Sequence, residues 1–376
     1  MPTANTATVV MSRLARLVAV DDAWLVALRG TLRRLATEPV RLIIGQQTAG
    51  SDFVRHAASR LQIPVESLTL AHPQSPDEGG PPERDRIVVQ SAQTVFVLTL
   101  RTGGNLHQLL RQRLLEQSGP VVLVDLPHLQ SEPARTELCE LGATTWAPTT
   151  EQCRPFDTVA ETTDLDKQRS NSRQPEILEI VPFPDAEHWK FLTHTTRACP
   201  GPWPGDGFET YVNQLLASQP SADHSPLGSL LRILQQRRLI ASRRAIRGGY
   251  SVVSLTACPL QDLPRLHQFR PHRVRWDFEP FGLCLRKDWL CRRGARPVAY
   301  GDEEHWQALA EQDRPFFQLA TGITGIDWSV ENEWRHVGDL DLSELTADDV
   351  ILFVPHTAAA RSVANVSDWP ITLWPQ

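Results

Sequence analysis

The stretch VRLIIGQQTAGSD, residues 40–52, decides the fold of the first part of the chain. Its apolar run stops at Gly45, a polar loop follows, and a helical pattern starts at Ser51. A buried strand, a tight turn and a helix N-terminus in this order are how α/β proteins build a pocket for a phosphate or a nucleotide. The stretch therefore predicts a strand, a ligand loop and a helix.

The sequence around this stretch alternates strand and helix patterns. Strands are expected at residues 40–44, 65–70, 94–100, 120–124 and 143–146, and helices at residues 12–36, 51–61, 106–117 and 133–141. Residues 85–91 fit either, and residues 72–84 should form a surface loop. The lead before Met11 is expected to be a disordered tail. Alternating strands and helices predict an α/β domain with a parallel, Rossmann-like sheet covered on both faces.

Tryptophan is distributed unevenly, which indicates two differently built cores. Trp24 and Trp146 are the only two before residue 185, and nine follow it. We therefore expect a first domain at residues 1–148, a polar linker at 149–185 and a separate α+β domain at 186–376. In that last domain strands are expected at residues 189–194, 250–256, 281–285, 297–300, 331–337 and 350–354, and helices at 208–216, 226–236 and 303–312.

Composition excludes several classes of protein. The 376 residues contain no apolar run near the roughly 20 needed to cross a bilayer and no secretory signal pattern, so a cytoplasmic protein without membrane contact is expected. A net charge of −6 argues against a general nucleic-acid binder but leaves room for a local basic face. The six cysteines form no CxxC pair and no zinc-like spacing with histidine, so no metal site is expected.

Two loops in the first domain form the first candidate site. Each follows a predicted strand, so both should lie at the carboxyl edge of the parallel sheet, where open α/β folds bind ligands. The candidate ligand-binding residues are Gly45, Gln46, Thr48, Gly50, Ser51, Asp52, Arg101, Gly103, Gly104 and Asn105. The alternative is that these are ordinary turn and capping residues. No Walker-type lysine is present, which argues against an ATPase.

The segments GQQTAGSD and LTLRTGGNLHQLL resemble the SLOG superfamily of Rossmann-like domains, which includes lysine-decarboxylase-like and DprA-like proteins. The resemblance covers roughly residues 38–148 and implies a nucleotide-type ligand and self-association into a homo-oligomer. The PGGxGTxxE motif of the enzymatic branch is missing, because Gly104 and Asn105 are followed by leucines. That departure favours sensing over hydrolysis of a nucleotide.

An acidic stretch in the second domain forms the second candidate site. If residues 331–337 are a strand, Glu331, Glu333 and Arg335 project to one face. A carboxylate there can stabilise a developing cation or position a nucleophile, and His194 with Arg197 can hold a phosphate or a ribose. The alternative is an exposed strand face with Glu–Arg pairs and a structural histidine.

The stretch WSVENEWR, residues 328–335, is similar to a bacterial family that includes AbiGi-type abortive-infection proteins and carries a W-x-x-E-x-E-W-R-like signature. The order of a His-x-Thr element, a helix, a Ser-Leu-Thr strand and an acidic strand also resembles ADP-ribosyltransferases of the DarT type. That resemblance implies NAD as substrate. His194 and Thr196 would contact it, Glu331 or Glu333 would be catalytic, and the family's middle aromatic would be Tyr211 or Tyr250.

Three functions follow from these patterns. The leading hypothesis is a bacterial defence or stress protein, in which a SLOG-like domain binds a nucleotide-derived ligand and the second domain is an effector such as an ADP-ribosyltransferase. The second is a non-enzymatic ligand-sensing module whose Trp-rich domain binds a partner protein. The third is a nucleotide hydrolase in the first domain.

Overall fold

A computed structural model of the chain describes residues 5–12, 14–15, 17–45, 49–68, 81–157, 178–182, 184–244, 246–271, 274–320 and 327–375. The chain divides into two compact units. The first consists of Met1–Thr162 and Pro200–Ala222, and the second of Thr163–Cys199 and Asp223–Gln376. Each unit is thus made of two separate stretches of chain, because residues 200–222 return to the first unit after the second has begun.

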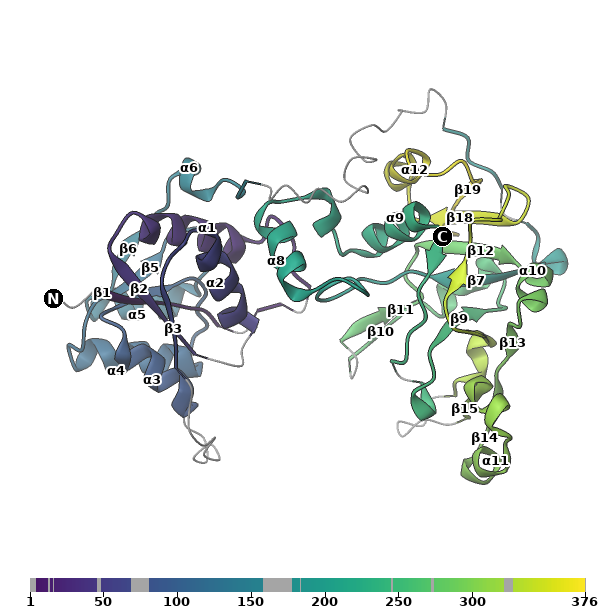
Figure 1. Cartoon of the computed structure of the whole chain (residues 1–376), viewed down its shortest axis with the longest axis horizontal. Coiled ribbons are helices and arrows are strands. Elements are labelled where there is room, and N and C mark those ends of the chain that lie inside the picture. Colours follow the sequence, from purple (N-terminus) through teal and green to yellow (C-terminus); the bar gives the residue numbers. More distant parts are fainter. Residues whose placement is uncertain are drawn as a thin grey trace. The chain divides into compact units, whose positions relative to one another are not determined.

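The first unit contains a six-stranded sheet in the order β3-β2-β1-β4-β5-β6, and every pair in it is parallel (Figure 1). The strands are β1 (Asn5–Val10), β2 (Val40–Gly45), β3 (Val65–Leu68), β4 (Thr94–Val97), β5 (Val121–Val124) and β6 (Thr144–Trp146). The helices are α1 (Ala23–Ala36), α2 (Ala49–Arg60), α3 (Glu83–Ser91), α4 (Asn105–Leu115), α5 (Glu132–Glu140) and α6 (Thr150–Cys153). This order is that of a doubly wound, Rossmann-like sheet, so the expected fold class is confirmed.

The central strand β1 corrects the expectation of a disordered tail before Met11. It pairs with β2 on one side and β4 on the other, and Ala7 and Val9 are buried. The stretch is rich in β-branched threonine and valine, which favour strands. Its sequence is too short and too polar to predict a strand that is buried on both faces. Within residues 12–36, where the pattern predicts one or two helices, the structure describes α1, which begins at Ala23.

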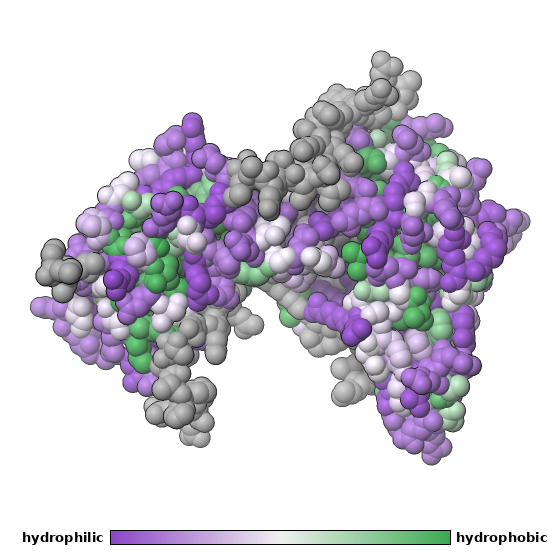
Figure 2. Space-filling model, viewed as in Figure 1, coloured by the Kyte–Doolittle hydropathy of each residue, from purple (hydrophilic) through white to green (hydrophobic). Residues whose placement is uncertain are grey.

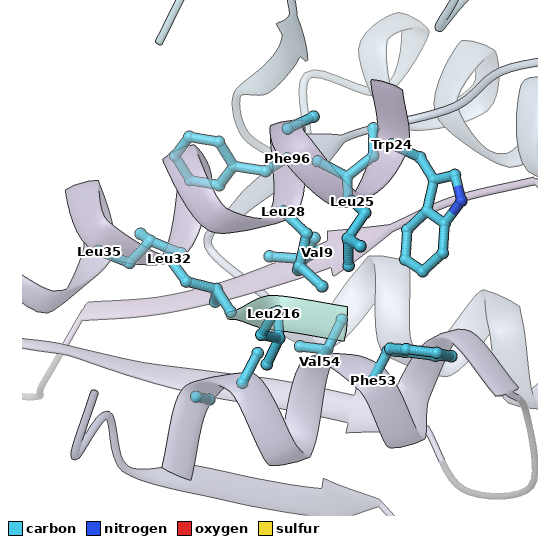
Figure 3. Packing of buried hydrophobic residues seen from close by; sticks show 14 of the residues in the cluster. Val9, Trp24, Leu25, Leu28, Leu32, Leu35, Phe53, Val54, Phe96 and Leu216 are labelled. Atoms are coloured by element: carbon cyan, nitrogen blue, oxygen red, sulfur yellow. The ribbon is translucent and has the colours of Figure 1, made fainter. Parts of the chain in front are cut away.

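The core of the first unit lies between α1, α2 and the sheet (Figure 3). Leu25, Leu28 and Leu32 on α1 are fully buried at helical spacing and face the same way. Helix α8 (Phe208–Leu216) completes this core although it follows the first strand of the second unit in sequence. Its residues Tyr211, Val212, Leu215 and Leu216 belong to the same buried cluster.

The second unit contains a seven-stranded sheet in the order β13-β16-β9-β7-β12-β18-β19 (Figure 1). All its pairs are antiparallel except β18–β19. The strands are β7 (Phe191–Thr195), β9 (Val252–Thr256), β12 (Gly282–Arg286), β13 (Arg296–Pro297), β16 (Glu333–Val337), β18 (Val350–Val354) and β19 (Ile371–Leu373). The helices are α9 (Pro226–Gln236), α10 (Lys287–Arg292), α11 (Glu303–Ala308) and α12 (Thr357–Ala364). The mixed order confirms an α+β architecture for this part.

Three two-stranded ribbons accompany this sheet. They are β10 (Gln268–Arg270) with β11 (Arg275–Asp277), β14 (Ala299–Gly301) with β15 (Phe317–Leu319), and β8 (Arg238–Leu239) with β17 (Leu340–Asp341). The strand expected at residues 297–300 is therefore divided between β13 and β14. The strand expected at residues 331–337 begins only at Glu333, because Ser329–Glu331 forms a 3-10 turn and Asn332 has a left-handed φ of 43°. Asparagine tolerates that conformation better than most residues.

Hydrophilic residues cover most of the visible face of each unit in Figure 2. Large hydrophobic side chains that are exposed among the described residues are few, and the two aromatic ones, Phe269 and Trp276, lie on the β10–β11 ribbon. No helix within the described ranges is long and apolar enough to span a bilayer.

The packing of α8 predicts that Leu215→Ala destabilises the first unit. Leu215 is fully buried in the cluster that also holds Leu25 and Leu28. The cavity left by the removed leucine side chain should lower that unit's free energy of unfolding by about 2–5 kcal/mol. The measurement is hydrogen exchange at β1 and β2. Leu115→Ala is the matched control, because Leu115 is 55% exposed on α4 of the same unit. Equal stability of the two variants would contradict the assignment of α8 to this core.

Candidate functional site

A cavity of about 130 Å³ opens in the second unit where β7 and β9 end and β16 begins. The three strands are neighbours in the sheet, although roughly 140 residues of sequence separate the first from the last. The register aligns Glu333 with Thr256 and Thr256 with Thr193, so one residue from each strand lies in a row. The cavity is lined by Thr193, Thr195, Arg197, Arg244, Ile246, Ser254, Leu255, Thr256, Arg275, Asp277, Phe278, Gln318, Trp328, Glu331, Glu333 and Arg335.

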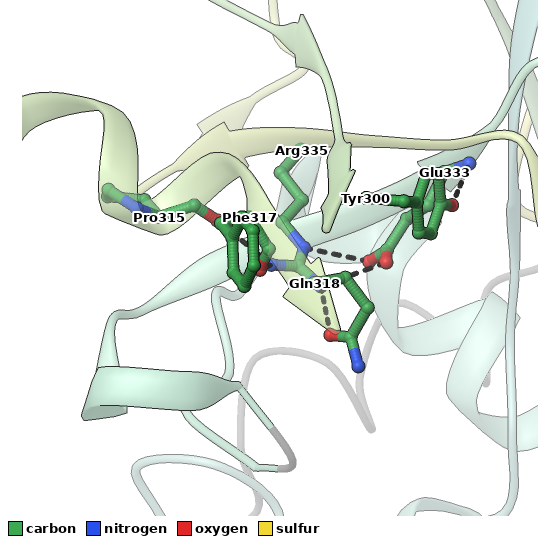
Figure 4. A network of polar contacts seen from close by, with 6 residues as sticks. All are labelled: Tyr300, Pro315, Phe317, Gln318, Glu333 and Arg335. Atoms are coloured by element: carbon green, nitrogen blue, oxygen red, sulfur yellow. Dashed lines mark hydrogen bonds and ion pairs between the residues drawn. The ribbon is translucent and has the colours of Figure 1, made fainter. Parts of the chain in front are cut away.

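The Arg335 guanidinium is the fixed centre of this site, and its side chain is only 1% exposed (Figure 4). Its Nε and Nη2 donate to the two carboxylate oxygens of Glu333, both at 2.9 Å. Nη2 also donates to Oε1 of Gln318 at 3.0 Å, and Nη1 donates to the carbonyl oxygens of Pro315 and Phe317 at 3.0 and 2.8 Å. All five N–H groups of the guanidinium are thereby used, which is what allows this charge to be buried.

Glu333 is held in place by the same contacts. Both of its carboxylate oxygens accept from Arg335, and its main-chain N–H donates to the Tyr300 hydroxyl oxygen at 3.1 Å. Burial, with the nearby negative charges of Glu333 and Glu331, raises the pKa of Tyr300 to about 12, so this phenol stays neutral. Both carboxylate oxygens of Glu333 are therefore occupied by Arg335, and the residue holds that guanidinium in place.

Glu331 differs from Glu333 although only one residue separates them. Its main-chain oxygen accepts from Thr256 Oγ1 at 2.6 Å, but its carboxyl group forms no hydrogen bond or ion pair with the residues that the structure describes. Burial, and then the negative charges of Glu333 and Asp277, raise the pKa of the Glu331 carboxyl to about 7. A carboxyl group with a pKa near neutrality in a cavity is suited to take up or release a proton.

Three arginines besides Arg335 line the cavity, namely Arg197, Arg244 and Arg275. Arg275 comes from the β10–β11 ribbon and pairs with the buried Asp277 at 3.2 Å, as does Arg270. Arg197 and Arg244 also line the cavity, and neither guanidinium forms an ion pair with any carboxylate in the described ranges. These two arginines are therefore available to an anionic ligand.

The histidine expected to contact NAD lies away from the cavity. Side chains alternate along β7, so Thr193 and Thr195 face the cavity and His194 points to the opposite face. The His194 Nδ1–H donates to the Ser254 carbonyl oxygen at 2.9 Å, and burial lowers its pKa to about 4. Thr196 is buried and donates to the carbonyl oxygen of Pro226 at 2.8 Å. His194 is thus a neutral structural residue, and neither it nor Thr196 lines the cavity.

Thr193 and Thr195 are site residues that the sequence reasoning missed. Arg197, which that reasoning did include, lines the cavity, and counting back from it in steps of two gives both threonines. The period of a strand was the signal that could have found them.

Neither tyrosine proposed as the middle aromatic lines the cavity. Tyr211 is buried in α8 within the core of the first unit. Tyr250 precedes β9 and lies against Gly248. The aromatic side chains that do line the cavity are Phe278 and Trp328. Phe278 has a left-handed φ of 54°, which is unusual for a bulky residue and typical of strained functional positions.

The loop after β2 belongs to the first unit, and Gln46 and Thr48 lie outside the described residues. Gly45 ends β2 as a buried residue beside Arg84 and Val88 of α3. Gly50, Ser51 and Asp52 lie in the first turn of α2.

Two of these α2 residues already have neighbours within the unit. A Cβ added to Gly50 would lie 3.1 Å from the Met11 sulfur, and the Asp52 carboxylate pairs with Arg55 at 2.5 Å. Asp52 therefore has a structural partner within its own helix.

The loop after β4 lies at the point where the strand order reverses, between β1 and β4. Gly103 has a φ of +72°, and its N–H donates to Nδ1 of His107 at 3.2 Å. Gly104 immediately precedes α4, and Asn105 is the first residue of that helix. The main-chain N–H of Arg101 donates to the Ser12 hydroxyl at 3.2 Å, which ties this loop to the one after β1. Strands β2 and β4, which the two candidate loops follow in sequence, thus lie on either side of β1.

Comparisons with known proteins place the chain in no family. No family model matches it, and no curated protein does. Among solved structures, DNA processing protein A (DprA) from Streptococcus pneumoniae is similar with 13% identity and a TM-score of 0.31, over 39% of this chain and 60% of that one. A protein of unknown function from Vibrio parahaemolyticus is similar with 11% identity and a TM-score of 0.22, over 40% of this chain and 97% of that one.

The pKa of Glu331 predicts a pH-dependent stabilisation by Glu331→Gln. The folded protein holds the Glu331 proton up to about pH 7, whereas the unfolded chain releases it near 4.5. Stability is therefore lost as pH rises through that window, and glutamine, which does not ionise, avoids the loss. We expect the stability gain of the variant to be about 2–3 kcal/mol larger at pH 8 than at pH 5.

The measurement is urea denaturation of both proteins at the two pH values. Glu304→Gln is the control, because Glu304 is exposed in the same unit. A pH-independent difference between Glu331→Gln and the native protein would show that the carboxyl group titrates normally.

Proposed function

We propose that the second unit transfers ADP-ribose from NAD and that Glu331 is its catalytic carboxylate. One observation supports this most strongly. A half-buried, unpaired carboxyl group with a pKa near 7 shares a cavity with two arginines that have no carboxylate partner among the described residues. The order of motifs along the chain resembles that of DarT-type transferases. If the resemblance holds, the strands that carry the early, middle and late motifs must meet at one site. Here β7, β9 and β16 are neighbours in the sheet.

The residues that line the cavity would take different parts in the reaction. Arg197 and Arg244 would bind the pyrophosphate, and the hydroxyl groups of Thr195 and Ser254 would bind ribose. As the bond between ribose C1′ and nicotinamide breaks, its electron pair leaves with nicotinamide and positive charge develops on the ribose ring. The Glu331 carboxylate would stabilise that charge and accept the proton released when the acceptor attacks C1′.

The first unit would bind a nucleotide-derived ligand that signals to this effector. The support is its Rossmann-like strand order, in which β2 and β4, the strands that precede the two candidate loops, lie on either side of β1. The resemblances to SLOG domains and to AbiGi-type proteins suggest a homo-oligomer acting in bacterial defence. Glu333 is paired and Glu331 is not, which favours the enzymatic hypothesis over a purely structural acidic strand.

The proposal predicts label transfer from radiolabelled NAD to a component of cell lysate or to the protein itself. Glu331→Gln should lower the rate about a hundredfold or more, because it removes the proton acceptor and the negative charge. Transfer by the native protein should rise with pH through about 7 as Glu331 ionises. The measurement is the initial rate between pH 5.5 and 8.5, with and without added nucleotides.

Glu304→Gln is again the matched control, and it should retain the native rate. Absence of transfer under every condition, or an unchanged rate in Glu331→Gln, would overturn the assignment of this carboxylate. A loss of transfer in Glu304→Gln as large as that in Glu331→Gln would overturn it as well.

A second candidate function is the binding of a partner protein through the β10–β11 ribbon. Phe269 and Trp276 on this ribbon are 42% and 44% exposed, and His267 stacks on Trp276 with ring centroids 4.6 Å apart. Exposed aromatic side chains of this kind are typical of interaction surfaces. This candidate predicts no label transfer, so the same experiment separates it from the enzymatic proposal.

A further inference from the structure

We infer that Gln318 is a specificity-determining residue, whose side-chain nitrogen donates a hydrogen bond to a carboxamide oxygen of the ligand. The inference rests on the proposed function and extends it, because it states which end of the ligand lies beside Gln318 and Glu331. Gln318 lines the cavity together with Glu331 and Glu333. It comes from β15, a segment that no sequence motif singled out.

The orientation of the Gln318 amide follows from its contact with Arg335. Arginine has N–H donors but no acceptor, so the group that faces Nη2 at 3.0 Å must be the amide oxygen. The amide nitrogen then points away from the guanidinium, as Figure 4 shows. The usual ambiguity between oxygen and nitrogen in a glutamine side chain is removed here by chemistry.

The position of Gln318 is fixed from several sides. Its strand pairs in parallel with β14, where Tyr300 is its register partner. The carbonyl oxygens of Phe317 and Pro315, just before it, accept from Nη1 of Arg335. The side chain is thus preorganised, and little freedom would be lost when it binds a ligand.

The side-chain nitrogen of Gln318 forms no hydrogen bond with any residue in the described ranges. Because Gln318 lines the cavity, this nitrogen can donate to a ligand. The cavity is lined by Arg197, Arg244 and Arg275 as well as by acidic residues, so net charge does not define the group that Gln318 recognises. Its N–H donors define that group as an oxygen acceptor.

Glu331 adds a complementary acceptor. Together, a donor on Gln318 and an acceptor on Glu331 match the oxygen and the N–H₂ of a primary carboxamide. Nicotinamide carries this group, whereas nicotinic acid carries a carboxylate, which has oxygen acceptors but offers no N–H to the Glu331 carboxyl group. The structure thus assigns the nicotinamide end of NAD to this side of the cavity.

The experiment compares the dissociation constants of NAD and nicotinic acid adenine dinucleotide, measured by calorimetry on the full chain. The native protein should bind NAD at least about tenfold more tightly. Gln318→Glu keeps an oxygen acceptor for Arg335 but loses both N–H donors, so its affinity for NAD should fall about tenfold. Gln318→Leu removes the donor without adding charge, and the preference for NAD should also shrink about tenfold.

Gln312→Glu is the matched control, because Gln312 is exposed and the substitution makes the same chemical change outside the cavity. It should keep the native affinity and preference. If the folded Gln318 variants bind NAD with the native preference, the inference about Gln318 is overturned and the proposed function stands. If the native protein binds neither dinucleotide, the proposed function fails and the inference fails with it.

Discussion

The buried guanidinium of Arg335 is the constraint on which the second unit's cavity depends. A charge with 1% exposure needs an acceptor for each of its five N–H groups, and the chain supplies them from two segments. Glu333 on the same strand takes two, and residues Pro315, Phe317 and Gln318 take the others. These contacts draw β15 against β16 and so determine which side chains line that wall of the cavity.

The same constraint separates the roles of two neighbouring carboxylates. Both carboxylate oxygens of Glu333 accept hydrogen bonds from Arg335, so the two charges balance each other. Glu331 precedes the strand, beyond the left-handed Asn332, and extends into the cavity without a partner among the described residues. Keeping that carboxyl group half-buried destabilises the folded protein above neutral pH. Natural proteins often retain such a local cost at sites that perform chemistry.

Some features could be predicted from the sequence because they depend on local periodicity. The bounds of α8, α9 and β18 agree with the patterns at residues 208–216, 226–236 and 350–354. Strand β1 could not be found this way, because its burial comes from neighbours on both sides. Periodicity also cannot show that α8 packs in the first unit, or that Glu331 lacks a partner while Glu333 has one. These features are set by contacts between residues far apart in sequence.

We propose that the second unit performs its chemistry in the cavity beside Arg335. A crystal structure of the full chain with carba-NAD would locate the site. In this analogue a methylene group replaces the ring oxygen of the nicotinamide-bearing ribose, which prevents cleavage. We expect this ribose to lie against Glu331, the pyrophosphate against Arg197, and the carboxamide against Gln318. Carba-NAD bound elsewhere, for example at the carboxyl edge of the first unit's sheet with the cavity beside Arg335 left empty, would contradict it.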